Sequence, residues 1–426
     1  MDERSFFSGK RFLITQPMIR SFCGSTMVTF ELAEFLTSVG AEATVYTNVA
    51  FPPALAMFEK AGIKVLAPKD DANFSLNDYD YVWVHSLTFP CQLLEELKRP
   101  PKKTPAFVFL HMSPLETIPD EHPWIFDLEN QLSSLSLYIS EGTLESNKKF
   151  GLPPHVGFFR NPAPLGYQEV AKRKVHRKLR TVLVVSNHPP AEVLEAKQIL
   201  LDNGIAAEIY GDGQDKYDPI TPAVLKKYDA VVTIGKTVQF CIVGAIPVYI
   251  YDWYGGPGWL TELNYVHSRR NNFSGRFSSK KTGKEIAQEI MEGYSNALDY
   301  HLAVLSKECK EYIIDSALER VLKKIKPRTI KSLDSKYIES AKAAVNCAEI
   351  RFVASEERGK AYEYCEDLKK QVGKREREIE DCKRRIEQLE AFRGKYYELA
   401  GSKRMRFLDA ILKPHDRIKG RFKKPK

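Results

Sequence analysis

The chain has 426 residues, 43% of them hydrophobic and 28% charged, which is enough for two globular domains and an extension. No apolar run approaches the roughly 18–20 residues of a membrane span, and the acidic start MDERSFFSGKRFLITQ does not have the form of a signal peptide. The seven cysteines are scattered without CxxC pairs, which excludes the usual zinc motifs and favours a reducing compartment. We therefore expect a cytoplasmic protein.

The net charge of +9 is concentrated at the C-terminus. Residues 401–426 hold ten Lys or Arg against Asp409 and Asp416, which leaves about +1 for the rest of the chain. Hydrophobic residues are interspersed with these cations: Met405, Phe407, Leu408, Ile411 and Leu412. This composition predicts a basic amphipathic tail that could lie on the inner, anionic face of a membrane. A disordered solubilising tail is the alternative. Nucleic acid is not expected as a partner, because aromatic and basic residues do not alternate as base stacking requires.

The first half of the chain alternates short apolar runs with helical patterns. Strands are expected at residues 11–15, 43–47, 63–67, 80–85, 107–111 and 137–140. Helices are expected from Gly24 to Gly40, where apolar residues fall on one face, and at 54–61. Strands that alternate with helices indicate a parallel sheet with helices on both faces.

A second cycle of the same kind begins after a basic connector near residues 172–180. Its strands are expected at residues 182–185, 207–210, 230–234 and 246–251, with helices at 191–203 and 236–244. Each half opens with a strand, a polar loop containing Gly or Pro, and a helix. The sequence thus predicts an α/β fold in which two Rossmann-like domains, 1–170 and 171–330, face each other across a cleft.

The stretch from Asp229 to Arg276 gives the clearest binding signal. A strand runs into Gly235-Lys236-Thr237 and then into a helix. Such sheets bind ligands beyond the carboxyl ends of their strands, and a helix start offers N–H groups and a favourable dipole to an anion. Lys236 adds a positive charge, so a phosphate site is predicted; a structural turn with a solvated lysine is the alternative. A triphosphate loop is not expected, because Ala230 occupies a position where that motif needs glycine.

Other loops at the predicted strand ends add candidate binding residues. Gly24 and Ser25 could close on donor phosphates from the first domain, and the loop 254–258 could approach a nucleotide or sugar through its glycines. The full set of expected binding residues is Gly24, Ser25, Asn187, Gly211, Gly213, Gly235, Lys236, Thr237, Gln239, Tyr254, Gly255, Gly256, Gly258, Asn272, Ser274 and Arg276.

One histidine is a candidate catalytic residue, and one acidic pair is a candidate metal site. His111 ends a predicted strand and could act as a base, although a structural histidine is the alternative. Asp78 and Asp80 form a DxD sequence, but they precede a strand instead of following one. We therefore interpret them as surface residues at a strand start and expect no metal site.

The C-terminal extension, residues 331–400, is expected to be helical. Residues 284–345 also have a helical pattern, and part of them is expected to return to the first domain. From Cys365 onward, apolar residues recur at alternating spacings of three and four: Leu368, Val372, Ile379, Cys382, Ile386, Leu389 and Tyr396. We call Cys365 and these residues the seam. Arg375 and Arg393 interrupt it, so the pattern predicts an imperfect coiled coil that could form a homodimer. An isolated charged helix is the alternative.

These motifs resemble those of the GT-B glycosyltransferases, in particular the family 4-like enzymes that build bacterial cell-surface polysaccharides. The resemblance covers roughly residues 10–300. The run CGSTMVTFELAEFLTSVGAEATVYT is similar to the opening glycine loop, helix and second strand of that superfamily, and Arg160-Asn161-Pro162 resembles the segment before its interdomain crossing. The combination of IGKT, GAIPVYIYD, GGPGWL and NNFSGR is similar to one branch of these enzymes.

The resemblance implies transfer of a sugar from a nucleotide-diphosphate sugar to a polysaccharide or lipid-linked acceptor. We expect this transfer to need no cofactor and, given the position of Asp78 and Asp80 before their strand, no metal. Cations and N–H dipoles would then stabilise the leaving diphosphate. The chain departs from the family pattern, because the two glutamates that many members carry are replaced by Val231 and Gln239. Two alternatives follow: a non-catalytic scaffold that acts through its coiled coil, and a nucleotide-sugar epimerase on the same fold. The epimerase would need acid/base carboxylates in the cleft.

Overall fold

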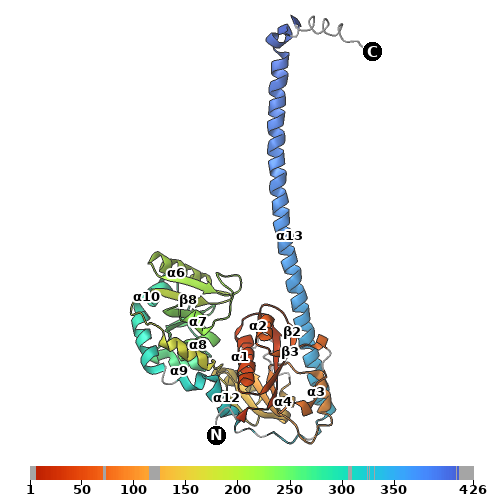
Figure 1. Cartoon of the computed structure of the whole chain (residues 1–426), viewed down its shortest axis with the longest axis vertical. Coiled ribbons are helices and arrows are strands. Elements are labelled where there is room, and N and C mark those ends of the chain that lie inside the picture. The colour runs from red at the N-terminus through yellow and green to blue at the C-terminus, as the bar shows by residue number, and fades with distance from the viewer. Residues whose placement is uncertain are drawn as a thin grey trace. The chain divides into compact units, whose positions relative to one another are not determined.

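A computed structural model describes residues 6–70, 73–114, 125–305, 309–323, 325, 327–330, 332–408 and 410–411. The chain divides into two compact units, Met1–Val353 and Ala354–Lys426 (Figure 1). The first unit contains two sheets with helices on both faces, and the second consists mainly of one long helix. The predicted α/β fold with two Rossmann-like domains and a helical extension is therefore confirmed.

The first sheet has seven strands in the order β3-β2-β1-β4-β5-β6-β7, and every pairing is parallel. The strands are β1 Arg11–Ile19, β2 Glu42–Ala50, β3 Lys64–Leu66, β4 Tyr81–His85, β5 Ala106–His111, β6 Ser133–Tyr138 and β7 Val156–Phe158. The helices of this part are α1 Gly24–Ser38, α2 Ala54–Lys60, α3 Cys91–Glu96, α4 Phe126–Leu132 and α5 Glu141–Asn147, with short 3₁₀ turns at Pro68–Asp70, Leu76–Asp78 and Lys148–Phe150. Successive strands are added on one side of β1 as far as β3 and on its other side from β4, so the boundary between β1 and β4 is the topological switch point of a doubly wound sheet.

The strands of this sheet are buried on both faces. Phe12 and Ile14 of β1 belong to one hydrophobic cluster, while Leu13 between them belongs to the cluster on the opposite face. In β4, Trp83 and its neighbour Val82 alternate in the same way. Successive side chains of a strand point to opposite faces, so a continuous apolar run is what a sheet covered on both sides requires.

The second sheet has the order β12-β11-β10-β8-β9, and only β12 is antiparallel. Its strands are β8 Thr181–Val185, β9 Ala206–Tyr210, β10 Ala230–Thr233, β11 Val248–Asp252 and β12 Gly255–Trp259. The helices are η6 Leu165–Lys172, α6 Ala191–Asp202, α7 Pro222–Leu225, α8 Lys236–Val243, α9 Glu262–Arg270 and α10 Gly283–Tyr300, followed by η7 His301–Leu305 and η8 Cys309–Tyr312. The switch point of this sheet lies between β8 and β10.

Strand β12 corrects the prediction of a loop at 254–258. The run of glycines looks like a loop in the sequence, but Gly255–Trp259 pairs antiparallel with β11. A Cβ on Gly256 would lie 2.0 Å from the carbonyl oxygen of Ile250, so the two backbones pack too closely for any side chain at this position.

The chain then returns to the first sheet, as expected for part of residues 284–345. Helix α12, Ile314–Leu322, contributes Ile314, Leu318 and Leu322 to the cluster that covers one face of the first sheet. Helix α13, Ser335–Gly401, begins with Ile338 and Val345 packed into the cluster on the other face. Both faces of the first sheet are thus closed by residues that follow the second sheet in sequence.

From Ala354, α13 forms the second unit, and the side chains described in it between 357 and 401 are almost all exposed. Of the predicted basic tail, residues 409 and 412–426 lie outside the described residues. None of the helices in the described part of the chain is long and apolar enough to cross a lipid bilayer.

His301, the first residue of η7 after α10, is a buried histidine whose titration affects stability. It is fully buried, neither ring nitrogen has a hydrogen-bond partner among the described residues, and burial lowers the pKa of His301 to about 3. A histidine whose pKa is lowered by folding supports the fold above its unfolded pKa of 6.5 and loses that support as the pH falls toward 3.

We expect His301→Phe to raise the free energy of unfolding at pH 7 by about 1–3 kcal/mol, because it removes unpaired buried polar atoms. The advantage should grow below pH 6.5, by at most about 1.4 kcal/mol per pH unit, because the variant has no proton to take up on unfolding. Urea denaturation between pH 5 and 8 measures both effects, with the exposed His267→Phe as control. Equal pH dependence of His301→Phe and wild type would contradict the expectation.

Candidate functional site

A cavity of about 570 Å³ lies where the carboxyl ends of strands from the two sheets meet. From the first domain it is lined by residues that follow β1 and β5, including Gly24, Ser25 and Ser113. From the second domain it is lined by residues that follow β8, β9, β10 and β11. This is the position, beside a topological switch point, at which doubly wound sheets bind their ligands. The volume is within the usual range for small-molecule sites.

Nine of the sixteen expected binding residues line this cavity. They are Gly24, Ser25, Asn187, Gly211, Gly235, Lys236, Thr237, Tyr254 and Asn272. The structure places the other seven, and His111, outside the lining: Gly213, Gln239, Gly255, Gly256, Gly258, Ser274 and Arg276. Sequence reasoning missed Tyr217, whose hydroxyl accepts a hydrogen bond from the Phe22 N–H at 3.3 Å across the domains. Tyr217 follows β9 in an irregular segment without a motif, so the sequence carries no signal for it.

Helix α8 begins directly at the cavity. Gly235 precedes it with φ +56° and ψ −129°, a conformation that favours glycine, and its N–H donates to the Phe273 carbonyl at 3.2 Å. The first N–H groups of a helix have no acceptor within the helix. The amides of Lys236 and Thr237 are therefore available at a wall of the cavity, where the helix dipole favours an anion.

The side chain of Lys236 turns away from this role. Its Nζ lies 2.6 Å from Glu31 Oε2 of α1, with both side chains at most 5% exposed. It also donates to the Asn161 carbonyl at 3.1 Å and to the Pro162 carbonyl. The predicted cation for a phosphate is thus a buried link between the domains, and its charge is matched by Glu31. Burial raises the pKa of Glu31 to about 7 and lowers the pKa of Lys236. For each residue the effect of burial on the pKa is larger than the opposing effect of its charged partner.

Two asparagines connect the domains beside this ion pair. Asn161 Nδ2 donates to Asn272 Oδ1 at 3.3 Å, and both residues line the cavity. Asn161 has φ +49° and Asn272 has φ +52°, which is uncommon for residues other than glycine. The Oδ1 atom of Asn161 is buried without a hydrogen-bond partner among the described residues. Backbone strain and an unpaired acceptor at a cavity wall are features of ligand sites.

The rim of the cavity is aromatic and cationic. Trp253 is 63% exposed and Tyr254 is 50% exposed. Lys280 Nζ lies 5.0 Å from the centre of the Trp253 ring, and the Arg276 guanidinium lies 5.4 Å from that of Tyr254. The two carboxylate oxygens of Asp252 accept hydrogen bonds from the backbone N–H groups of two different segments, from Tyr254 at 2.7 Å and from Gly275 at 3.0 Å. Asp252 thus shapes the rim that presents the two rings.

The expected residues outside the lining have local structural roles. Gln239 is buried in α8, and its amide lies within hydrogen-bonding distance of Asn272 Oδ1 and of the Gly235 and Lys236 carbonyls. The glycines 255, 256 and 258 belong to β12, so the expectation that they approach a nucleotide is not supported by the geometry. Gly213 lies at an exposed turn, and Ser274 belongs to the loop after α9.

The histidine predicted as a catalytic base lies beside the cavity. His111 Nε2 is 3.0 Å from Glu129 Oε1, and the His111 ring stacks on Tyr138 with 4.7 Å between centres. The next two residues, Met112 and Ser113, do line the cavity. These contacts hold His111 at the end of β5, outside the cavity lining, and its catalytic role stays a prediction.

The DxD pair is engaged at a strand start. Asp80 Oδ2 accepts a hydrogen bond from the Arg11 backbone N–H at 3.0 Å, and Asp80 Oδ1 lies 3.3 Å from Lys103 Nζ. Within the described part of the chain, no three His, Cys, Asp or Glu side chains are grouped as metal ligands would be. The absence of a metal requirement stays a prediction.

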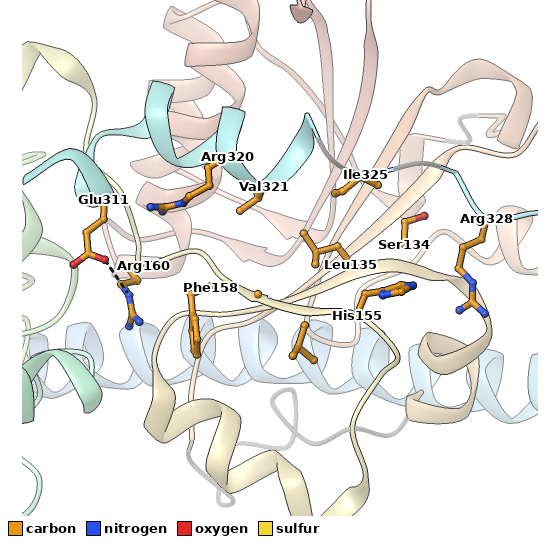
Figure 2. Close-up of a pocket in the computed structure, with 12 residues that line it drawn as sticks. Ser134, Leu135, His155, Phe158, Arg160, Glu311, Arg320, Val321, Ile325 and Arg328 are labelled. Atoms are coloured by element: carbon orange, nitrogen blue, oxygen red, sulfur yellow. Dashed lines mark ion pairs between the residues drawn. The ribbon is translucent and has the colours of Figure 1, made fainter.

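A second cavity, of about 650 Å³, lies along β6 and β7 (Figure 2). Apolar residues such as Leu135 and Ile325 lie between its two polar ends in Figure 2. Arg160, at one end, is matched by two carboxylates: it bonds Glu141 through both terminal nitrogens and lies 3.4 Å from Glu311. None of the expected binding residues lines this cavity. The cavity between the sheets is therefore the better candidate site.

Solved structures with a similar arrangement of the chain include several sugar-handling enzymes. A glycosyltransferase from Rickettsia africae is 12% identical, covers 74% of this chain and 97% of its own, and has a TM-score of 0.46. A sucrose-phosphate synthase from Thermosynechococcus elongatus is 9% identical, covers 73% and 97%, and scores 0.44. A UDP-N-acetylglucosamine 2-epimerase is 10% identical, covers 68% and 98%, and scores 0.33.

No protein-family model and no curated protein sequence matches the chain. Identities of 12% or less and TM-scores below 0.5 carry no conclusion about activity. The fold is accordingly assigned from the chain's own strand order, and the function is argued from the cavity.

The ion pair yields a prediction about stability. Lys236→Ala should lower the free energy of unfolding by about 3–5 kcal/mol, because it leaves the Glu31 carboxylate buried without its cation. Adding Glu31→Gln should recover a large part of the loss, because the two residues act as a pair. Urea denaturation at pH 8 measures this, with the exposed Lys226→Ala as control. The expectation would be contradicted if Lys236→Ala were as stable as the control but bound nucleotide more weakly. That result would indicate that the lysine binds the ligand.

Proposed function

We propose that the cavity between the two sheets binds a nucleotide-diphosphate sugar and that the protein transfers the sugar to a saccharide or lipid-linked acceptor. One observation carries the proposal: the N-terminus of α8, opened by Gly235, forms a wall of a cavity at the strand ends of both domains. Backbone amides at such a point suit the diphosphate of a donor. The resemblance of the sequence to GT-B glycosyltransferases, among them the family 4-like polysaccharide enzymes, supports the same function.

The lining residues suggest how the donor would lie. The amides of Lys236 and Thr237 would hold the diphosphate and stabilise the charge that develops on it as the sugar leaves. Trp253 or Tyr254 would stack on the base, with Lys280 and Arg276 as nearby cations. Gly24 and Ser25 of α1 would approach the phosphates from the facing domain. We propose no metal and no cofactor for this step, and a positioning role for His111.

Removal of the rim tryptophan tests donor binding. Trp253→Ala should weaken binding of the cognate nucleoside diphosphate about 5- to 150-fold, the value of one base–aromatic stack. The fold should be unaffected because the side chain is largely exposed. Isothermal titration calorimetry with UDP, GDP and dTDP measures this, and Phe277→Ala, also highly exposed but outside the cavity, is the matched control. If none of the three nucleotides binds, the proposal fails and a non-catalytic scaffold becomes the better interpretation.

Assays of the product separate transfer from epimerisation. A transferase releases nucleoside diphosphate only with an acceptor, whereas an epimerase changes the sugar without one. Asp218 and Asp252 are carboxylates in the cavity lining, and Asp252 is already engaged by two backbone amides. We therefore favour transfer. The NMR spectrum of the sugar after incubation without acceptor decides between the two, and repetition with EDTA tests the proposed metal independence.

We also propose that residues 401–426 attach the protein to an anionic membrane, where a lipid-linked acceptor would be. The support is the sequence: the tail carries nearly all of the net charge together with interspersed apolar residues.

Deletion of 401–426 should abolish sedimentation with liposomes that contain phosphatidylserine or phosphatidylglycerol, and nucleotide binding should stay intact. Binding of the full chain should weaken from 50 to 500 mM salt, because salt screens the attraction over about 10 Å at 0.1 M. Neutral phosphatidylcholine liposomes are the control. Full-length protein that ignores anionic liposomes at low salt would rule out the anchor.

A further inference from the structure

The second unit presents an apolar stripe that is exposed in the described part of the chain. Seam residues of α13 are exposed to solvent; Ile379, for example, is 55% exposed and Leu389 is 62% exposed. Leu368 and Val372 also lie among the exposed hydrophobic residues. An apolar row at alternating spacings of three and four along a helix is the surface that packs into a second helix.

We propose that the seam pairs with the seam of a second copy of this chain, and that the two helices run antiparallel with their two-fold axis between Glu380 and Asp381. The residues opposite each other then have numbers that add to 761, so that Val372 faces Leu389 of the partner subunit and Ile379 faces the partner's Cys382. This pairing uses the whole seam, since Cys365 lies opposite the partner's Tyr396. It involves only the second unit and is independent of the proposed sugar transfer.

The two arginines in the seam argue against a parallel pair. In a parallel, in-register coiled coil each seam residue faces its own copy, so Arg375 would meet the partner's Arg375 and Arg393 the partner's Arg393. Like charges opposed at a seam are unfavourable. In the antiparallel register, Arg375 faces Ile386 of the partner subunit and can extend its charged end to water. Within its own helix Arg375 also lies 3.2 Å from Glu378, which supplies a counter-charge.

The charges beside the seam select the same register. On each side of the seam, one row of residues flanks the apolar contact and faces the same row of an antiparallel partner. The residue numbers of facing pairs add to 759 in one row and to 763 in the other. Opposite charges then meet in three kinds of pair, each present twice in the dimer: Lys369 with Glu390, Glu376 with Lys383, and Glu378 with Arg385. Shifting the register by one heptad toward the N-terminus would instead bring Glu378 against the partner's Glu378, and a shift toward the C-terminus would bring Arg385 against the partner's Arg385.

A charge swap tests the register. Lys383→Glu should weaken the dimer about 5- to 30-fold in sedimentation equilibrium, because two Glu–Glu contacts replace two attractive pairs. The double variant Lys383→Glu with Glu376→Lys should restore the wild-type dissociation constant. In a parallel pair the double variant would not be rescued, because Lys383 would then face the partner's Glu378. Arg384→Glu, which changes a charge on the outer face of the same helix, is the matched control.

Native cysteines give a second, independent readout. In full-length protein with Cys347→Ser and Cys382→Ser, mild oxidation should leave Cys365 uncrosslinked, because its copy lies roughly 46 Å away along the pair. Adding Tyr396→Cys should produce a disulfide-linked dimer through Cys365, and Cys365→Ser should abolish it. Crosslinking through Cys365 alone would show a parallel pair, and a monomer at 100 µM would show that no dimer forms; either result overturns the proposal.

Discussion

The buried ion pair between Glu31 and Lys236 is the constraint on which the cleft depends. It joins the second turn of α1 to the first turn of α8, the two helices that begin at the cavity from opposite domains. The same ammonium group binds carbonyls of the crossing segment at Asn161 and Pro162. Removing two charges from water is costly, and Glu31 Oε1 is buried without a hydrogen-bond partner among the described residues, so the carboxylate depends on the lysine for its stabilisation. Burial raises the pKa of Glu31 and lowers that of Lys236, so desolvation is the larger effect on both.

This constraint determines how an anion could be held. Because the lysine is committed to Glu31, the α8 amides are what this wall of the cavity offers an anion among the described residues. Amides at a helix start are rigid and need no rearrangement when charge develops near them, which suits a leaving diphosphate. Two other cations, Lys280 and Arg276, lie at the rim over Trp253 and Tyr254. Such a division would place the phosphate deep in the cavity and the base near solvent.

Most of the fold could be predicted from the sequence, because buried strands and helices show hydrophobic residues in patterns that repeat over a few neighbouring positions. The sites at strand ends followed from that, and nine expected residues do line the cavity. The partner of Lys236 could not be predicted: Glu31 is far away in the chain and looks like an ordinary polar residue of α1. Strand β12 was missed because a run of glycines in a sequence usually indicates a loop. Here the glycines allow the backbone of β12 to pack closely against that of β11.

Helix α13 shows that one continuous helix can carry two unrelated apolar stripes. Ile338, Ala341, Val345 and Ala348 pack on the first sheet at spacings of three and four. Continued with the same spacing, that stripe would reach residue 366, whereas the seam uses Cys365. A difference of one residue turns the apolar face by about 100° around the helix. The seam is therefore not an extension of the contact with the sheet. The change of phase follows the boundary at Val353, so the contact with the sheet and the seam belong to different units.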